Sequence, residues 1–397
     1  MREALDTPLR DDQRTGLPAW TYHSPALTEL EKKELFATHW QIAGHVSDIP
    51  EPGGFLAFDF ADERALVLRD SRGEVRAFHN LCRHRGARVV AEPAGRCKGA
   101  LVCPFHGWVY NLDGSLRGPA RPSSFGKMDR SRFGLIEMEL EIWHGFLFVR
   151  ARPGPQPPVA ELFARFDAEL APFRMETLVP AQGYYHGEVP VNWKSVRDVD
   201  NEGYHVAMAH PALQDLYGEG YRDEVMAQGM NRAVAPYNDH TGRRWSVRHY
   251  RTLAEPAAHL PDWAQARWAY YGLFPNNVIG VTPESVQFYQ DFPIDTRNTR
   301  LRGRTYRFPS ETRRQRAARY LACRIDRETY QEDIRLSMWS DEAMRSSAFP
   351  GFHLSDHEIG VRAHHDGLRE ALPVLQLEEN PGESRMVETN ERLACQS

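Results

Sequence analysis

The chain has 397 residues with a hydrophobic fraction of 41%, a charged fraction of 26% and a formal net charge of −5. This length accommodates two domains, and the ordinary composition allows each of them to bury a core. The apolar runs fall well short of the roughly 20 residues that cross a bilayer, and the arginines are interspersed with acidic residues, which argues against a nucleic-acid surface and favours a small-molecule substrate.

The first predicted elements are a short helix and a set of strands. The preceding segment, MREALDTPLRDDQRTGL, is charged and lacks the apolar stretch of a secretory signal, so we expect a cytoplasmic protein. Ser24 as N-cap and Pro25 in the first turn predict a helix. Short runs of β-forming residues separated by turns then predict a small all-β domain. These runs are Phe55–Phe60, Ala65–Arg69, Val75–Phe78 and Trp143–Val149.

Two pairs of cysteine and histidine form the strongest motif. Cys82 and His84 are followed, after 18 intervening residues, by Cys103 and His106. This set suits a [2Fe-2S] cluster in which one iron binds the cysteines and the other binds the histidines. We expect each pair at a hairpin tip. A structural zinc site also uses two Cys and two His, but it opens with a pair of cysteines rather than with Cys-x-His. The other cysteines are interpreted as bystander thiols: Cys97, Cys323 and Cys395.

The segments CRHRGARV and CPFHGWVYNLDGSL resemble the two ligand loops of Rieske domains, including the Gly-Trp-x-Tyr sequence and the later Gly114. The resemblance implies a Rieske [2Fe-2S] domain in this part of the chain. The interval of 18 residues is slightly long for that family, and it falls in a loop that can absorb it.

The proline-rich segment at residues 151–158, ARPGPQPP, excludes a helix or a central strand and marks the predicted domain boundary. After it, Val286–Phe292 and Leu301–Phe308 predict long antiparallel strands, and residues 311–347 favour a helix. The expected fold class is α+β, with a helix-grip domain of antiparallel sheet and helices following the all-β domain. The predicted division is an N-terminal helical segment (1–39), a Rieske domain (40–150) and a catalytic domain (151–397).

His205 and His210 are candidate ligands of a second metal, on a predicted helix Trp193–Ala209 that ends before Pro211. Two histidines and a carboxylate bind Fe(II) and leave positions open for O₂. A spacing of five residues separates side chains by about 140° on a regular helix, so the histidines converge only if the helix breaks or contains a π-type turn. Glu202 can hydrogen-bond His205 from the same face. The alternative is that both are ordinary surface histidines.

The segment NWKSVRDVDNEGYHVAMAHP resembles the iron-binding stretch of Rieske ring-hydroxylating oxygenase large subunits. The resemblance implies a mononuclear Fe(II) bound by His205 and His210. It gives Glu202 the role of bridging His205 to a cluster histidine of the neighbouring subunit, and thus of carrying electrons between subunits. Many members of the family have Asp in place of Glu202 and Asn in place of Asp198, so the role of Asp198 stays open.

The third ligand must come from later in the chain. Residues 330–334, YQEDI, resemble the family's ligand-bearing helix, which makes Asp333 our choice. Glu332 points about 100° away on the same helix, and Asp291 and Asp326 are the alternatives. Four histidines without a carboxylate at matching spacing are interpreted as surface or packing residues: His353, His357, His364 and His365.

Electrons must come from another protein, because no GxGxxG motif follows a predicted strand and no P-loop is present. By the same resemblance, the partner is a flavin and iron–sulfur reductase fed by NAD(P)H, and O₂ is the co-substrate. The resemblance also implies a homotrimer in which the cluster of one subunit lies beside the iron of the next. Such head-to-tail contacts close a ring.

The substrate is predicted from aromatic residues and from a further resemblance. An aromatic cage holds a quaternary ammonium by cation–π attraction, whereas an aromatic pocket also stacks a benzenoid ring. The bridging Glu and the segments QEDI and HEIGVRAHHDGLREAL resemble the branch acting on carnitine, glycine betaine or proline betaine. We therefore predict hydroxylation or N-demethylation beside a cationic nitrogen; the alternative is hydroxylation or O-demethylation of an aromatic acid. A minority of these aromatic residues are expected to line the pocket: Trp263, Trp268, Tyr270, Tyr271, Phe274, Phe288, Tyr289 and Phe292.

Two other classes of protein fit part of this pattern: a Rieske electron carrier fused to a ligand-binding module, and a zinc-stabilised binding protein. Metal content separates the three. The oxygenase holds about three irons per two acid-labile sulfides, the carrier holds about two, and the zinc protein holds neither iron nor sulfide.

Overall fold

The computed structural model describes residue 10, residues 14–226 and residues 229–396. Most of the charged N-terminal segment, on which the cytoplasmic expectation rests, lies outside these residues. Two compact units are present: one holds the chain up to Leu35, Asp167–Phe173 and the chain from Ala181 onward, and the other holds Phe36–Phe166 and Arg174–Pro180. None of the helices in the described ranges has the length and apolarity of a membrane span.

The smaller unit is an antiparallel β structure, as its turn-punctuated β-forming runs predict. Its strands form a four-stranded sheet of order β4-β3-β2-β5 and two three-stranded sheets, β6-β7-β8 and β1-β10-β9. The strands are β1 (Gln41–His45), β2 (Gly54–Phe60), β3 (Glu63–Arg69), β4 (Val75–His79), β5 (Ala94–Arg96), β6 (Leu101–Val102), β7 (Val109–Tyr110), β8 (Leu116–Gly118), β9 (Glu139–Trp143) and β10 (Phe146–Arg150), followed by the helix α2 (Val159–Phe163) and, at the end of the unit, β11 (Val179–Pro180).

The prediction of one strand over Trp143–Val149 is wrong. β9 ends at Trp143, β10 begins at Phe146, and the two pair with each other as a hairpin. His144 and Gly145 between them have φ of 46° and 84°. Two successive left-handed residues make the tight turn whose twist matches that of paired strands. Gly145 within the run was the local signal for this turn.

The larger unit has the predicted α+β, helix-grip architecture. Its strands follow the order β18-β17-β16-β15-β14-β13, and β12 pairs with β18. The strands are β12 (Tyr185–Val189), β13 (Arg222–Val225), β14 (Met230–Pro236), β15 (Arg267–Leu273), β16 (Asn277–Thr282), β17 (Ser285–Asp295) and β18 (Asn298–Arg307). The helices are α1 (Pro25–Glu31), α3 (Asp167–Leu170), α4 (Trp193–Asp200), α5 (Val206–Ala209), α6 (Pro211–Leu216), α7 (Trp245–Leu253), α8 (Arg313–Ala343), α9 (Ile359–Ala371) and α10 (Met386–Ala394).

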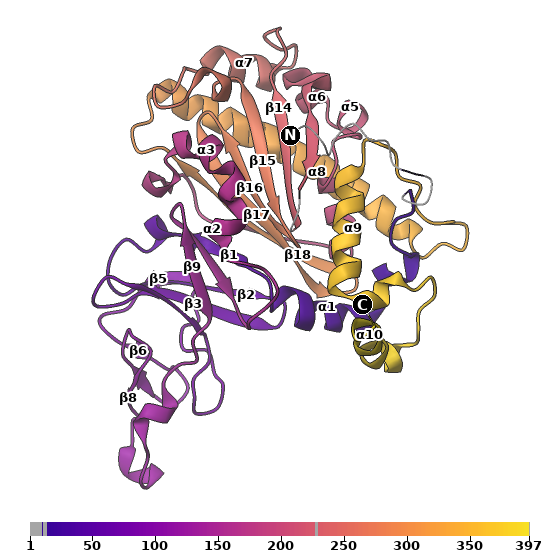
Figure 1. Cartoon of the computed structure of the whole chain (residues 1–397). Helices are drawn as coiled ribbons and strands as arrows, with labels where there is room; N and C mark the ends of the chain where they lie inside the picture. Colours follow the sequence, from indigo (N-terminus) through magenta and orange to yellow (C-terminus); the bar gives the residue numbers. More distant parts are fainter. Residues whose placement is uncertain (1–9, 11–13, 227–228, 397) are drawn as a thin grey trace. The chain divides into compact units, whose positions relative to one another are not determined.

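The long helix α8, drawn in orange in Figure 1, extends along this sheet. Its N-cap is Thr312, whose side chain accepts a hydrogen bond from the Gln315 N–H in a capping box. One part of α8 packs through Leu321 and Ile325 in a cluster that includes Trp268 of β15. Another part packs through Ile334 and Met338 beside Leu301 of β18. Between these two contacts, α8 carries polar residues, and a cavity opens there.

The prediction of one helix over Trp193–Ala209 is wrong, because α4 ends at Asp200 and α5 begins only at Val206. Gly203 lies in the break. A side chain there is excluded, since an added Cβ would lie 2.1 Å from the ring of Tyr221. His205 and His210 lie at the two ends of α5, as its N-cap and its C-cap, so the two site histidines do not lie within one regular helix.

Candidate metal centres and the adjoining cavity

The four predicted cluster ligands lie on two loops of the smaller unit with the same backbone pattern. Gly86 and Gly107 each donate an N–H to the carbonyl of the cysteine four residues earlier, at 2.9 and 3.0 Å. The N–H of each cysteine, Cys82 and Cys103, donates to the carbonyl five residues later, at 2.7 and 2.8 Å. The two glycines have φ of 71° and 70°, which glycine adopts without strain. Each loop therefore turns tightly enough to present one Cys and one His together.

The expected hairpin tips are found for only one of the two loops. Cys103 and His106 lie between β6 and β7, which pair with each other. Cys82 and His84 lie between β4 and β5, which pair with β3 and β2 respectively. The hairpin prediction is wrong for this first loop. It connects opposite edges of a four-stranded sheet, and that connection depends on strand order, which the local sequence does not encode.

Side chains of like kind meet at the loop tips. Cys82 and Cys103 are both buried. Burial raises the pKa of the Cys82 thiol, and the adjacent Cys103 adds to the rise. The rings of His84 and His106 lie 4.7 Å apart between centroids, and the buried His84 Nδ1 has no hydrogen-bond partner among the described residues. This sorting, thiol beside thiol and imidazole beside imidazole, fits a two-iron cluster with one pair on each iron.

A tyrosine completes the surroundings of the cysteine pair. The hydroxyl of Tyr110 accepts a hydrogen bond from the Arg83 N–H at 2.9 Å. Its own hydrogen is then available to the Cys82 Sγ at 3.2 Å. Hydrogen bonds to cluster sulfurs are one of the features that set the reduction potential. Sequence reasoning noted the Gly-Trp-x-Tyr sequence but gave the tyrosine no role.

His205, His210 and Asp333 converge in the larger unit, and their ligand atoms all lie within 4.8 Å of one another. The two Nε2 atoms are 2.9 Å apart, and Asp333 Oδ1 lies 2.8 Å from His210 Nε2 and 3.3 Å from His205 Nε2. The His210 backbone, with φ of −116° and ψ of 78°, leaves the helical conformation just before Pro211. This break is the geometry that the spacing of five residues required.

Each histidine has a carboxylate behind it. Glu202 Oε1 lies 2.5 Å from His205 Nδ1, and Glu332 Oε2 lies 2.9 Å from His210 Nδ1. A carboxylate accepts hydrogen bonds, so both Nδ1 atoms carry hydrogen and both Nε2 lone pairs point at Asp333. Three acceptors then face one another without a donor, an arrangement that a metal cation satisfies. Burial opposes protonation of His205, but its contacts to Asp333 and Glu202 outweigh burial and raise its pKa to about 10, so these carboxylates favour a positive charge at this point, which a metal ion would also provide.

The role of Glu332 was missed at the sequence level. Its offset of about 100° from Asp333 on the helix excluded it as a ligand of the same ion. An imidazole has two nitrogens on different sides of its ring, so Asp333 and Glu332 reach His210 from neighbouring directions. Glu202 was predicted to accept a hydrogen bond from the ligand histidine His205, and the same reasoning could have identified Glu332 as the partner of His210.

The other candidate residues lie elsewhere. Asp291 contacts Arg197 Nε through Oδ1 at 2.6 Å, and Asp326 accepts a hydrogen bond from Gln287 at 3.0 Å, so the structure brings neither alternative to the histidines. Asp198 accepts from the Tyr22 hydroxyl at 2.6 Å and contacts His365 Nε2 at 2.8 Å. His364, which precedes His365 in the chain, is also buried, and its Nε2 contacts the Pro275 carbonyl. These polar groups bind the helices α4 and α9 to their surroundings.

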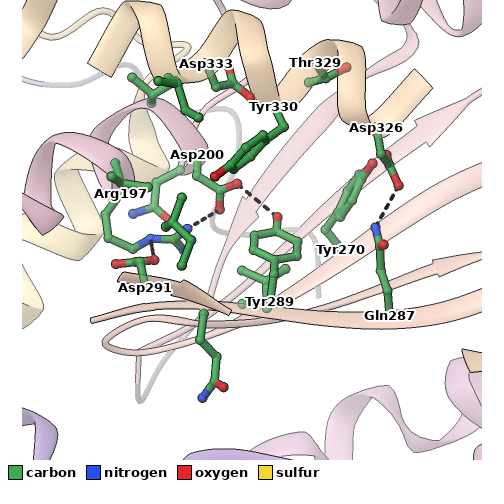
Figure 2. A pocket seen from close by; sticks show the side chains of 18 of the residues that line it. Arg197, Asp200, Tyr270, Gln287, Tyr289, Asp291, Asp326, Thr329, Tyr330 and Asp333 are labelled. Carbon is green, nitrogen blue, oxygen red and sulfur yellow. Dashed lines mark hydrogen bonds and ion pairs between the residues drawn. The ribbon is translucent and has the colours of Figure 1, made fainter. Parts of the chain in front are cut away.

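A cavity of about 750 Å³ opens from the histidine–aspartate site. Two of the eight aromatic residues singled out in the sequence, Tyr270 and Tyr289, line it. Figure 2 shows both phenols between the sheet and α8, with Tyr289 hydrogen-bonded to Asp200. Five other tyrosines that line the cavity were not identified from sequence, because they come from several separate segments. They are Tyr184, Tyr185, Tyr217, Tyr221 and Tyr330.

The structure thus holds two separate metal-binding arrangements, one for a two-iron cluster and one for a single ion. The family model "Ring hydroxylating alpha subunit (catalytic domain)" matches residues 175–373, and the model "Rieske [2Fe-2S] domain" matches residues 39–128. The chain belongs to the family of ring hydroxylating alpha subunits and carries a Rieske [2Fe-2S] domain ahead of the catalytic domain.

Named relatives share part of the chain. The glycine betaine monooxygenase oxygenase subunit of Pseudomonas aeruginosa is 34% identical over 215 residues, which cover 53% of this chain and 49% of that protein. The carnitine monooxygenase oxygenase subunit of Escherichia coli is 25% identical over 289 residues, covering 71% and 72%. The match to the first of these therefore spans about half of its length.

Solved structures share the fold over most of the chain. A quaternary ammonium Rieske monooxygenase superposes with a TM-score of 0.76 at 20% identity, covering 92% of this chain and 99% of that one. Naphthalene 1,2-dioxygenase from Rhodococcus sp. superposes with a TM-score of 0.72 at 19% identity, covering 92% and 95%. These likenesses confirm the predicted fold class.

Proposed function

We propose that the chain is the oxygenase component of a multicomponent Rieske non-haem iron system. It uses O₂ and electrons from a partner reductase to hydroxylate or N-demethylate a small quaternary-ammonium substrate. The observation that carries this proposal is the cavity beside His205, His210 and Asp333, because seven tyrosines and the carboxylate of Asp326 are among the residues that line it. Phenol rings and carboxylates both attract an organic cation. The names of relatives, which include glycine betaine, carnitine and choline monooxygenases, support the same substrate class.

The side chains have distinct proposed tasks. His205, His210 and Asp333 hold a mononuclear Fe(II), and Cys82, Cys103, His84 and His106 hold the [2Fe-2S] cluster. Fe(II) bound by two histidines and a carboxylate supplies open positions for O₂. Glu202 and Glu332 fix the histidine tautomers by accepting the Nδ1 hydrogens. The tyrosines orient the substrate and exclude water.

We also propose a homotrimer in which Glu202 links the mononuclear site of one subunit to the cluster of the next. In the segment that follows Glu202, Tyr204 has an exposed fraction of 59% and Met208 one of 90%. Beside the cluster ligand His106, Phe105 has an exposed fraction of 54%. Exposed apolar side chains next to an electron-transfer group suit a docking contact between copies. The reductase is proposed to be a flavin and iron–sulfur protein fed by NAD(P)H, and the location to be cytoplasmic.

The functional division into 1–39, 40–150 and 151–397 remains our proposal for the chain. It differs from the compact units, in which α2 belongs with the β structure before it. For α2, the two divisions differ because one places the boundary at the proline-rich segment 151–158 and the other places it at Phe166.

The test is O₂ uptake driven by NADH and a matched reductase, across a panel of betaines, carnitine, choline and aromatic acids. We expect uptake with coupled product formation for the quaternary ammonium compounds. A response to aromatic acids alone would overturn the cationic assignment and support hydroxylation or O-demethylation of an aromatic acid. A purified protein with two irons per two sulfides and no turnover would instead support an electron carrier.

The proposed bridge has its own test. Glu202→Gln keeps an acceptor for His205 but removes the charge, so we expect both metal sites to stay filled while electron transfer from cluster to mononuclear iron slows. Metal analysis and single-turnover cluster oxidation measure the two quantities. Wild-type turnover in this variant would remove Glu202 from the electron path.

A further inference from the structure

Two of the three arginines on the cavity wall are neutralised by carboxylates. Arg197 contacts Asp291 at 2.6 Å and Asp200 at 3.1 Å. Arg232 contacts Glu169 at 2.7 Å and Glu224 at 2.8 Å. The remaining arginine of the lining, Arg327, is exposed to solvent. The carboxylates that are bound to arginine, or that face the metal site, are therefore not available to a substrate cation. Asp223, another carboxylate of the lining, accepts the Gly203 N–H at 3.1 Å and is affected by the charge of Glu202.

Asp326 differs from these carboxylates. It lines the cavity, and the hydrogen bond recorded for its side chain comes from a neutral donor, Gln287 Nε2, at 3.0 Å. Figure 2 shows the Asp326 carboxylate reaching from α8 toward Gln287 on β17, with the Tyr270 ring beside it. Burial raises the pKa of Asp326 to about 6, and the Gln287 hydrogen bond only partly offsets that rise. A nearby cation would stabilise the charged form.

Three tyrosines lie close enough to this carboxylate for its charge to affect them. Burial and, next in size, the charge of Asp326 raise the pKa values of Tyr185, Tyr217 and Tyr270. All three tyrosines line the cavity. A carboxylate within a group of phenol rings is the combination that binds an alkylated ammonium, since the rings accept its methyl groups and the carboxylate balances its charge.

The distance to the metal site also suits this role. Asp326 and Asp333 are seven residues apart on α8, so they lie on the same face of the helix and are separated by about 10 Å along its axis. A small organic cation held at Asp326 can therefore extend to His205, His210 and Asp333.

We propose that Asp326, supported by Gln287 and by the rings of Tyr185, Tyr217 and Tyr270, binds the cationic nitrogen of the substrate. This inference rests on the proposed function and deepens it, because it assigns the selection of a cation over a neutral molecule of the same shape to one carboxylate. Sequence reasoning considered Asp326 only as an alternative metal ligand.

The test is a calorimetric titration of the metal-loaded protein with choline and with its neutral carbon analogue, 3,3-dimethyl-1-butanol. We expect the wild type to bind choline more tightly than the analogue. Asp326→Asn should weaken choline binding by about tenfold or more, as expected for losing a partly desolvated charge partner, and should leave the analogue nearly unaffected. Asp326→Glu should retain the preference. Unchanged iron content and cluster absorbance verify that each variant is folded.

Glu328→Gln is the matched control. It removes the same charge from the same helix two residues further on, where Glu328 pairs with Arg324 at 3.0 Å and lies outside the cavity lining. We expect its affinities to equal those of the wild type. A choline preference that persists in Asp326→Asn, or one that Glu328→Gln removes equally, would overturn the inference.

The titration needs no turnover, so it separates two failures. Retained discrimination in Asp326→Asn overturns the inference even when the substrate panel responds to quaternary ammonium compounds. A panel that responds only to aromatic acids overturns the proposed function even when the titration finds a cation site.

Discussion

The cluster loops take all four proposed ligands from one stretch of chain, between Cys82 and His106, whereas the proposed mononuclear site takes two ligands from the two ends of α5 and one from α8, far later in the sequence. In the loops, backbone hydrogen bonds between near neighbours and two glycines of positive φ hold the ligands. In the mononuclear site, contacts between distant elements hold them. We therefore expect the loops to respond to changes within themselves and the mononuclear site to changes well outside it.

The largest expected effect comes from the distant ligand. Asp333→Ala removes the carboxylate that lies 2.8 Å from His210 Nε2, so the mononuclear iron should be lost and turnover should fall to background. The loss should exceed the roughly 10- to 100-fold typical of losing a partner behind a ligand. Cluster absorbance should not change, because its ligands belong to the other unit. Iron and sulfide analysis of the purified variant measures both; a lost cluster would contradict the separation of the two centres.

The sequence alone predicted most of the cluster loops and less of the mononuclear site, for a physical reason. Local turns are encoded locally, so Cys82, His84, Cys103 and His106 could be identified from spacing. The long strands β17 and β18 and the helix α8 were also predicted, because their periodicity extends over many residues. Asp333 required a resemblance to a known family, since no spacing relates it to His205.

Other features were beyond local reasoning. The break after Asp200 depends on Tyr221 packing against Gly203, a contact between separate segments, although Asn201 and Gly203 are residues that often end helices. The cavity tyrosines come from several elements that only the fold brings together. The role of Asp198 also depends on distant partners, Tyr22 and His365.

A buried ion pair beneath α4 provides the next test. Lys194 Nζ lies 2.6 Å from Glu31 Oε1, and both side chains have an exposed fraction of 0%. Glu31 also accepts a hydrogen bond from Trp193 Nε1 at 2.8 Å. Glu31→Gln leaves a buried charge without its partner, which costs about 3–5 kcal/mol. We expect a lower unfolding temperature and weaker iron retention, because α4 leads into Glu202 and His205.

The double variant Glu31→Gln with Lys194→Met is its control. Removing both charges should recover most of the lost stability, since a buried ion pair adds little beyond an apolar pair of similar size. Thermal denaturation of the single and double variants measures the difference. A double variant as unstable as the single one would show that the packing of α4, rather than its charge balance, is disturbed.

A smaller effect is expected at the carboxylate behind His210. Glu332→Ala removes the acceptor of the Nδ1 hydrogen at 2.9 Å, so the ring and its tautomer are less well fixed. The affinity for iron should fall by about 10- to 100-fold, while Glu332→Gln, which keeps an acceptor oxygen, should lose less. Competition with a chelator measures the affinity. Equal affinities in all three proteins would mean that Asp333 alone orients His210.

The smallest effects belong to the cluster loops, and here two glycines give an internal comparison. A non-glycine residue in the left-handed conformation costs about 1–2 kcal/mol, so Gly86→Ala and Gly107→Ala should both destabilise the smaller unit. An added Cβ at Gly86 meets no atom within 4 Å, whereas one at Gly107 lies 3.2 Å from the Ala120 Cβ. Gly107→Ala should therefore lose cluster absorbance at the lower temperature. Iron at His205 and His210 should be retained in both; if it is lost together with the cluster, the two centres are not assembled independently.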